Sequence, residues 1–315
     1  MQRFRPTSQP NTLSDKANAD LVNQRFMPPR TVVQSSGPKV ELKIARTLGM
    51  DNDTRGALAQ ITALADKEKI GVAGRFMQDA GVSALLAKLG VAEKVEEADF
   101  FQYNRIVIPY GGVSPRLRRK WEEAGHRIED LTSPFVRRAQ VALGLLRMEG
   151  AQPLVIGRHE DAETLALSAG SPTTIVLETT TDTARLVFSP AFGVVCQTNL
   201  SNRRVAWLVQ QLRHRYRDSR VTFLNTISPA MAAREDALEQ LLVDCDLVVI
   251  VGEEGETSCE ALLETAMRRG KPAMVVSSAA QVNAEMRSHR RIAFSAGAFA
   301  TDETVRAVAM ALVGK

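Results

Sequence analysis

A histidine and two carboxylates crowd into one short stretch of the chain. His159, Asp161 and Glu163 occupy alternate positions. His159 and Glu163 are four residues apart, a spacing that places two side chains on one face of a helix. Two such groups form a fragment of a metal site, and an ordinary surface pair has the same spacing. The sequence contains no GxxxxGK[ST], GxGxxG, GxSxG or HExxH motif, any of which would have indicated a specific chemistry.

Three candidate helix caps follow predicted strands. Asp51 is the first, and Ser-Pro pairs supply the others at Ser133-Pro134 and Ser228-Pro229. Serine at the N-cap accepts hydrogen bonds from free backbone amides, and proline fits the first helical position because it has no N–H to lose. The caps are 82 and 95 residues apart, which predicts three similar units. Around a pseudo-threefold axis, three helix N-termini would meet at one centre and favour an anion there.

Short apolar runs alternate with amphipathic segments from residue 39 onward. Segment 201–217 places Val205, Leu208 and Leu212 on one face at helical spacing. Strands that alternate with helices indicate an α/β protein with mainly parallel sheets. We expect strands at 40–45, 70–73, 105–109, 127–131, 154–157, 174–177, 193–197, 221–225, 247–251 and 273–276, and further helices at 54–66, 115–125, 134–149, 230–243, 258–269 and 302–313.

The first 38 residues differ from the rest of the chain. Residues 1–38 hold five of the 13 prolines and three of the four net positive charges. They show no sustained periodicity, as expected for a flexible arm. Such an arm either docks a protein partner or is a solvated extension. We divide the remainder into α/β units at 39–133, 134–223 and 224–315.

Composition excludes several classes of protein. A chain of 315 residues, 44% apolar, can bury a core without disulfides or structural metals. Only 5% of the residues are aromatic and the charge beyond the arm is nearly balanced, which argues against nucleic acid as a partner. The longest aliphatic run, Leu247–Val251, is too short to cross a membrane. The three cysteines lack CxxC spacing and there is no apolar signal segment, so we expect free thiols and a cytoplasmic location.

Six short motifs occur in an order and spacing that resemble one protein family. They are Gly112-Val-Ser114, Asp130-Leu-Thr-Ser-Pro-Phe-Val136, Val155-Ile-Gly157, Cys196-Gln-Thr-Asn-Leu-Ser201, Asp246-Leu-Val-Val-Ile-Val-Gly252 and Ser295-Ala-Gly-Ala298. The series is similar to that of the LytB-type 4-hydroxy-3-methylbut-2-enyl diphosphate reductases. The resemblance covers residues 39–315 and implies three α/β units in a pseudo-threefold trefoil around a central cavity.

The resemblance also implies an iron–sulfur cluster held by one cysteine from each unit. The corresponding positions here are Asp51, Ser133 and Ser228. Such clusters select soft thiolate ligands, which serine and aspartate do not replace as a set. Cys196 and Cys259 are the two thiols expected near the cavity, too few for the site. We therefore expect no cluster, no other cofactor and no reduction of the family's substrate.

The substrate site implied by the resemblance is altered as well. The family's diphosphate-binding histidines correspond to Gly74, Gly111 and Asp161, its Thr-Thr pair to Thr198-Asn199, its Ser-x-Asn segment to Glu256-Thr257-Ser258, and its late cavity serine to Phe299. Glu256 would repel a diphosphate, and Phe299 would fill space. Glu163 matches the family's proton-relay glutamate.

Three hypotheses remain open. In the first, a cluster-free LytB-like protein binds a small polar or anionic ligand in its cavity, with Glu163 as the acid–base residue beside Asp51 and Asp161, since clustered carboxylates raise one another's pKa. In the second, a pseudoenzyme serves as a scaffold or regulatory subunit. In the third, His159 and the three carboxylates hold a hard metal ion. The candidate ligand-binding residues are Ser133, Ser228, Thr198, Asn199, Thr257, Ser258 and His159.

Overall fold

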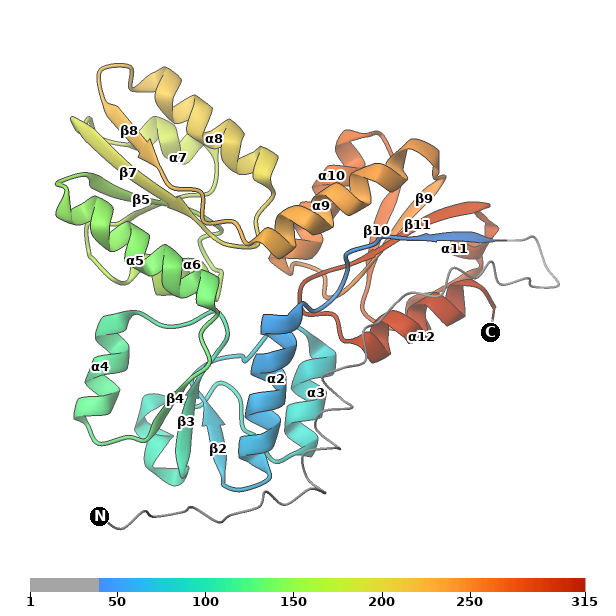
Figure 1. Ribbon diagram of the computed structural model, residues 1–315, viewed down its shortest axis with the longest axis horizontal. Helices are drawn as coiled ribbons and strands as arrows, with labels where there is room; N and C mark the ends of the chain where they lie inside the picture. The colour runs from blue at the N-terminus through green and yellow to red at the C-terminus, as the bar shows by residue number, and fades with distance from the viewer. Residues whose placement is uncertain (1–39, 315) are drawn as a thin grey trace, which may run out of the picture. The chain divides into compact units, whose positions relative to one another are not determined.

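The structure is a computed structural model that describes residues 40–314. Figure 1 shows three groups of strands, each flanked by its own helices, which we call lobes 1, 2 and 3. All strand pairs within these residues are parallel. Because parallel neighbours need a crossover, helices connect the strands and cover the sheets. The predicted α/β class is confirmed; the predicted arm, 1–38, lies outside the described residues.

Lobe 1 carries a three-stranded sheet of order β2-β3-β4. Ile61 and Leu86, from two of its helices, pack with Val72 and Val107 of the sheet in one buried cluster. Its elements are β2 (Ile70–Val72), β3 (Arg105–Ile108), β4 (Ile128–Asp130), α2 (Asn52–Ala65), α3 (Ala80–Lys88), the 3₁₀ helix η1 (Glu97–Gln102) and α4 (Pro115–Glu123).

Lobe 2 carries a four-stranded sheet of order β6-β5-β7-β8. Val205, Leu208 and Leu212, the apolar face predicted for segment 201–217, are buried in its core. Its elements are β5 (Gln152–Ile156), β6 (Ile175–Leu177), β7 (Ala191–Cys196), β8 (Arg220–Phe223), α5 (Pro134–Met148), α6 (Ala162–Ser168), α7 (Thr180–Arg185) and α8 (Asn202–Arg215).

Lobe 3 carries a four-stranded sheet of order β1-β11-β9-β10. All five residues of β9 are buried, since neighbouring strands flank it and helices cover it. Its elements are β1 (Glu41–Ile44), β9 (Leu247–Val251), β10 (Ala273–Val276), β11 (Arg291–Ala296), α9 (Pro229–Leu241), α10 (Thr257–Arg268), α11 (Ala284–Ser288), α12 (Asp302–Leu312) and the 3₁₀ helices η2 (Leu242–Asp244) and η3 (Ala279–Gln281).

The first strand corrects the unit boundary drawn from the sequence. We placed it in the unit 39–133, but β1 pairs in parallel with β11, Glu41 opposite Arg291. Lobe 3 is therefore built from both ends of the described chain. Strand β11 was itself missed, because alanines and Ser295 dilute its apolar run. Its burial depends on pairing with β1 and β9, which no local pattern encodes.

Within residues 40–314, no helix combines the length and apolar character that crossing a membrane requires.

Candidate functional site

A central cavity of about 290 Å³ is lined by residues of all three lobes. Four helices begin at its wall: the N-caps of α2, α5, α6 and α9 are Asp51, Ser133, Asp161 and Ser228, and all four line the cavity. Three of these caps are the ones predicted from the sequence; Asp161 is the addition. Their common position gives the cavity the partial positive charge of four helix N-termini.

The two serine caps keep a hydrogen-bond donor in reserve. The Ser133 Oγ accepts from the amide of Phe135 at 3.3 Å, and the Ser228 Oγ accepts from that of Met231 at 3.2 Å. A hydroxyl that accepts a hydrogen bond still has its own proton to donate. Both serines therefore present an O–H group at the cavity wall.

Asp51 is more fully engaged. Its Oδ1 accepts from the Thr54 amide at 2.9 Å and from the Thr54 hydroxyl at 2.9 Å. Its Oδ2 lies 3.7 Å from Nη2 of Arg234. The carboxylate thus caps α2 and also balances a buried cation.

Arg234 of α9 is the largest fully buried side chain among the described residues, at 1% exposed. Its Nε and Nη2 donate to the Gly49 carbonyl at 3.1 and 2.5 Å. Desolvation lowers the pKa of the guanidinium, and the charge of Asp51 partly offsets this effect. Nη1 makes no hydrogen bond within the described part of the chain, and Arg234 lines the cavity. A charge-assisted donor is therefore available there.

Two aromatic rings occupy another part of the wall. Tyr110 and Phe299 pack edge to face with centroids 5.9 Å apart, and both line the cavity. The Tyr110 and Thr54 hydroxyls lie 3.2 Å apart, and because the single Thr54 proton is donated to Asp51, the phenol is the donor. Burial raises the pKa of Tyr110, so its phenol remains protonated. Phe299 takes up space as expected from the sequence.

Glu163 lies in the first turn of α6, lines the cavity and is 6% exposed. Its carboxyl oxygens accept from the Thr198 amide at 2.6 Å and from the Thr198 hydroxyl at 2.9 Å. Burial, helped by the charge of Asp161, raises the pKa of Glu163 to about 8, although the Thr198 hydrogen bonds oppose the shift. At neutral pH most of this side chain is the neutral acid.

A hydrogen-bonded chain joins lobes 2 and 3 behind Glu163. Asp161 accepts from the Glu163 amide at 2.9 Å and from the Thr257 hydroxyl at 2.8 Å. Gln197 donates through Nε2 to Thr257 at 3.2 Å and to Asn199 at 2.9 Å. The Thr257 hydroxyl makes two of these hydrogen bonds, and Thr257 does not line the cavity. Thr198 and Asn199 do line it.

Glu256 is buried in a capping role. It accepts from the amides of Ser258 and Cys259, each at 3.0 Å, and from the Ser258 hydroxyl at 2.5 Å. Burial raises its pKa. The Ser258 hydroxyl oxygen in turn accepts from the Ala298 amide at 2.7 Å. Ser258 is thus an internal brace and, contrary to our expectation of a ligand-binding residue, it does not line the cavity.

The prediction that His159 lies on one helix face with Glu163 and binds a ligand in the cavity is wrong. Asp161 caps α6, so the helix begins at Ala162 and His159 precedes it. The imidazole is about half exposed, with Nε2 3.6 Å from Oδ2 of Asp182. His159 and Glu163 therefore share no helix face, and His159 does not line the cavity.

Neither a hard-metal site nor a thiolate site takes shape in the described chain. No group of three His, Cys, Asp or Glu side chains between residues 40 and 314 has metal-binding geometry. Cys196, Cys245 and Cys259 are all buried, and none lines the cavity. The donor set expected of an iron–sulfur site does not match these residues.

An ion pair between lobes 1 and 3 includes Arg75, a residue of the cavity wall. Nη1 and Nη2 of Arg75 in lobe 1 donate to the two carboxylate oxygens of Glu253 in lobe 3 at 2.7 and 2.6 Å. From lobe 2, Arg158 donates to the Gly255 carbonyl at 2.6 Å. These contacts fix the loops of the three lobes beside the site.

Arg234, Tyr110 and Thr54 were not predicted from the sequence. Arg234 is six residues after the cap Ser228, about 1.7 turns along α9, so its spacing from the cap did not place it on the same side of the helix. No local pattern distinguishes it from a solvated arginine. Tyr110, two residues after β3, is adjacent to Gly111, a position already aligned with a family histidine.

The amino-acid sequence is similar to those of one protein family. The family model described as LytB protein matches residues 54–313. The 4-hydroxy-3-methylbut-2-enyl diphosphate reductase of Treponema denticola is 24% identical over 277 residues, 83% of this chain and 95% of the relative. The enzyme of the same name from Azotobacter vinelandii is 31% identical over 68% of this chain and 71% of its own length.

A solved structure shows the same fold. The E-1-hydroxy-2-methyl-but-2-enyl-4-diphosphate reductase from Plasmodium falciparum superposes with a TM-score of 0.79 at 20% identity, covering 85% of this chain and 86% of that one. The three parallel sheets are thus those of a diphosphate reductase fold. The chain belongs to the LytB family.

Proposed function

We propose that this LytB-family protein works without an iron–sulfur cluster and binds a small organic anion in its central cavity. Arg234 and the two serine caps hold the anionic group, and Glu163 exchanges a proton with the bound molecule. The observation that carries the proposal is the free Nη1 group of a fully buried arginine at a cavity wall.

The cluster-free part rests on the donor set. At the family's three cysteine positions stand two hydroxyls and a carboxylate, each engaged as a helix cap. The thiols lie elsewhere, and burial raises the pKa of Cys196 to about 11 and that of Cys259 well above its ordinary value. Thiols in such surroundings stay protonated, whereas a cluster needs thiolates.

The anion-binding part rests on how three of the four acids that line the cavity are used; the fourth, Glu160, is exposed to solvent. Asp51 and Asp161 accept hydrogen bonds from amides and hydroxyls, and Glu163 is mostly neutral near pH 7 because its pKa is raised to about 8. Arg234 and the O–H groups of Ser133 and Ser228 face the same space. Their donors complement a carboxylate or phosphate group.

The size of the cavity limits the ligand. About 290 Å³ is at the lower end of ligand-site volumes. Phe76, Tyr110, Phe135 and Phe299 supply apolar wall for a short hydrocarbon portion. A neutral Glu163 donates a proton to a basic atom of such a ligand and, once ionised, takes one back.

The test is calorimetric titration of the full chain with pyruvate and malonate. At least one of them should bind, and Arg234→Lys should weaken it by about tenfold or more, since hydrogen bonds to charged groups contribute about 1.5–3 kcal/mol. The control is Arg203→Lys, because Arg203 is an exposed residue of α8 that does not line the cavity. Should Arg234→Lys unfold, the double variant Ser133→Ala, Ser228→Ala tests the same contact.

Failure of both anions to bind, or binding that neither Arg234→Lys nor the double serine variant weakens, would overturn the proposal. The scaffold or regulatory-subunit hypothesis would then be preferred, with a protein partner as its ligand.

A further inference from the structure

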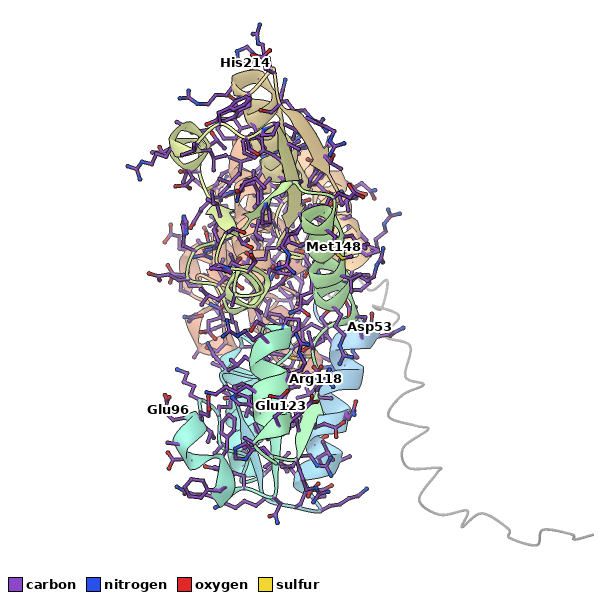
Figure 2. The ribbon with its side chains drawn as sticks, turned by 90° about the vertical axis from the view of Figure 1, so that its left-hand side faces the viewer. Asp53, Glu96, Arg118, Glu123, Met148 and His214 are labelled. Atoms are coloured by element: carbon purple, nitrogen blue, oxygen red, sulfur yellow. The ribbon has the colours of Figure 1, made fainter. Side chains whose placement is uncertain are left out.

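A second pocket, of about 200 Å³, lies between α4 of lobe 1 and α5 of lobe 2. Figure 2 views the side of the molecule that carries these helices, with Arg118 labelled on α4 and Met148 on α5. We call it the arginine pocket, because its wall includes Arg116, Arg119 and Arg147. It shares no lining residue with the central cavity.

The arginine pocket has no acidic residue in its lining. Arg118, between the two α4 arginines, pairs with Glu122 at 2.9 Å and Asp130 at 2.7 Å. Of the basic side chains on α4, the two that turn to the pocket are the two without an ion pair in residues 40–314. The positive charges of α4 that face the pocket are therefore the ones that no carboxylate in residues 40–314 neutralises.

The third arginine, Arg147, belongs to the wall of the pocket that α5 forms. Arg147, in the last turn of α5, donates through Nη1 to the Gly170 carbonyl at 3.3 Å, a contact that orients its guanidinium without neutralising it. It has no carboxylate partner in the part of the chain that the structure describes. Three guanidinium groups around one small concavity give it a positive potential that favours an anion.

Uncharged groups complete the wall. Gln140 is fixed by donating to the Val113 carbonyl at 2.9 Å. Thr174 also lines the pocket, and its hydroxyl oxygen is buried without a hydrogen-bond partner among the described residues. This oxygen is too deeply buried for the contents of the pocket to reach it, so Thr174 contributes only shape to the wall and the charges carry the case for a ligand.

We infer that the arginine pocket binds the phosphoryl group of a small molecule. Guanidinium groups match phosphate oxygens with paired N–H donors, and three of them complement a polyvalent anion better than a single carboxylate. The site is separate from the central cavity, so it stands or falls independently of the function proposed above.

Titration of the full chain with pyrophosphate tests this assignment, with inorganic phosphate and ATP as further probes to distinguish a free phosphate from a nucleotide. Arg119→Ala and Arg147→Ala should each weaken pyrophosphate binding by about tenfold, whereas Thr174→Val, which changes only a buried oxygen of the wall, should leave it within about twofold. These arginines are exposed, so circular dichroism should show intact folding.

The matched control is Arg213→Ala. Arg213 is exposed on α8, has no ion pair in residues 40–314 and lines neither cavity; its removal lowers the net charge equally and should leave affinity within twofold. Arg234→Lys should also leave pyrophosphate affinity unchanged. The inference is wrong if none of the three phosphates binds at millimolar concentration, or if Arg213→Ala weakens binding as much as Arg119→Ala does.

Discussion

At the scale of single residues, Glu163 is held where its charged form is costly and its neutral form is useful. Two hydrogen bonds from Thr198 orient it, yet burial and the neighbouring Asp161 raise its pKa to about 8. A carboxyl group that only capped a helix would gain from being ionised and solvated. In the proposed function, Glu163 exchanges a proton with the bound anion near neutral pH, which explains why an acid stands at this buried position.

The raised pKa predicts how stability depends on pH. The pKa of Glu163 is near 4.5 in the unfolded chain and about 8 in the folded one, so folding takes up a proton between these values. The free energy of unfolding therefore falls as the pH rises from about 5 to 8, by at most about 1.4 kcal/mol per pH unit from this group. Glu163→Gln removes this titrating group. The free energy of unfolding of the variant, relative to that of the native protein, should therefore increase as the pH rises.

Urea unfolding at pH 5, 6, 7 and 8 measures this difference. Glu160→Gln, an exposed neighbour at the same cavity, is the control and should run parallel to the native protein. Parallel curves for Glu163→Gln as well would show that Glu163 is ionised throughout. In the proposed function, Glu163→Gln should also abolish proton exchange with a bound anion while leaving the fold intact.

At the scale of secondary-structure elements, the helix starts do two jobs. Ser133 and Ser228 cap α5 and α9 through single backbone contacts. Asp51 caps α2 and also lies beside the buried Arg234. The same short segments therefore terminate helices and supply the polar wall of the cavity.

Substitution of the caps should separate these jobs. Ser228→Ala should cost about 1 kcal/mol of unfolding free energy, as is typical for an N-cap. Asp51→Ala should cost more, about 2 kcal/mol, because it also leaves a buried guanidinium less compensated. Asp51→Asn keeps the cap and removes only the charge. Guanidinium unfolding of the three variants gives the comparison; equal losses for Ser228→Ala and Asp51→Ala would mean that Asp51 does not balance Arg234.

At the scale of the whole molecule, contacts between lobes surround the cavity. The pair Arg75–Glu253 joins lobes 1 and 3, and the hydrogen bond from Thr257 to Asp161 joins lobes 2 and 3. The cap residues Asp51, Ser133 and Ser228 bond to their own helices, so the contacts between lobes are made by other side chains.

Anaerobic incubation of the full chain with iron and sulfide should accordingly produce no stoichiometric cluster. The physical reason is the absence of thiolate ligands at the cavity wall. Visible absorbance together with iron and sulfide analysis gives the answer, with a cysteine-containing family member treated in parallel. One tightly bound cluster per chain would contradict the proposed function.

Part of this site could be read from the amino-acid order. A Ser-Pro pair after an apolar strand specifies a helix cap because the hydrogen bonds involved span only two or three residues. Both such pairs, and Asp51, cap helices in the structure. The family motifs placed Glu163, Thr198 and Asn199, and all three line the cavity.

His159 shows where such prediction fails. Its four-residue spacing from Glu163 predicts a shared helix face, but the start of α6 depends on the Asp161 side chain. Arg234 shows the converse, because a residue that is usually solvated is here 1% exposed. Burial of a charge is decided by everything packed around it, so local composition does not reveal it.

The sequence by itself determined the α/β class, the helix caps and the family, because each depends on periodicity, on contacts a few residues long or on an ordered set of motifs. Only the tertiary structure decided that β1 joins β11, that Arg234 is buried at the wall of the cavity and that Thr257 and Ser258 are internal braces. It also decided the raised pKa of Glu163. Strand pairing and desolvation depend on groups far apart in the chain, and their free energies exist only once those groups have been brought together.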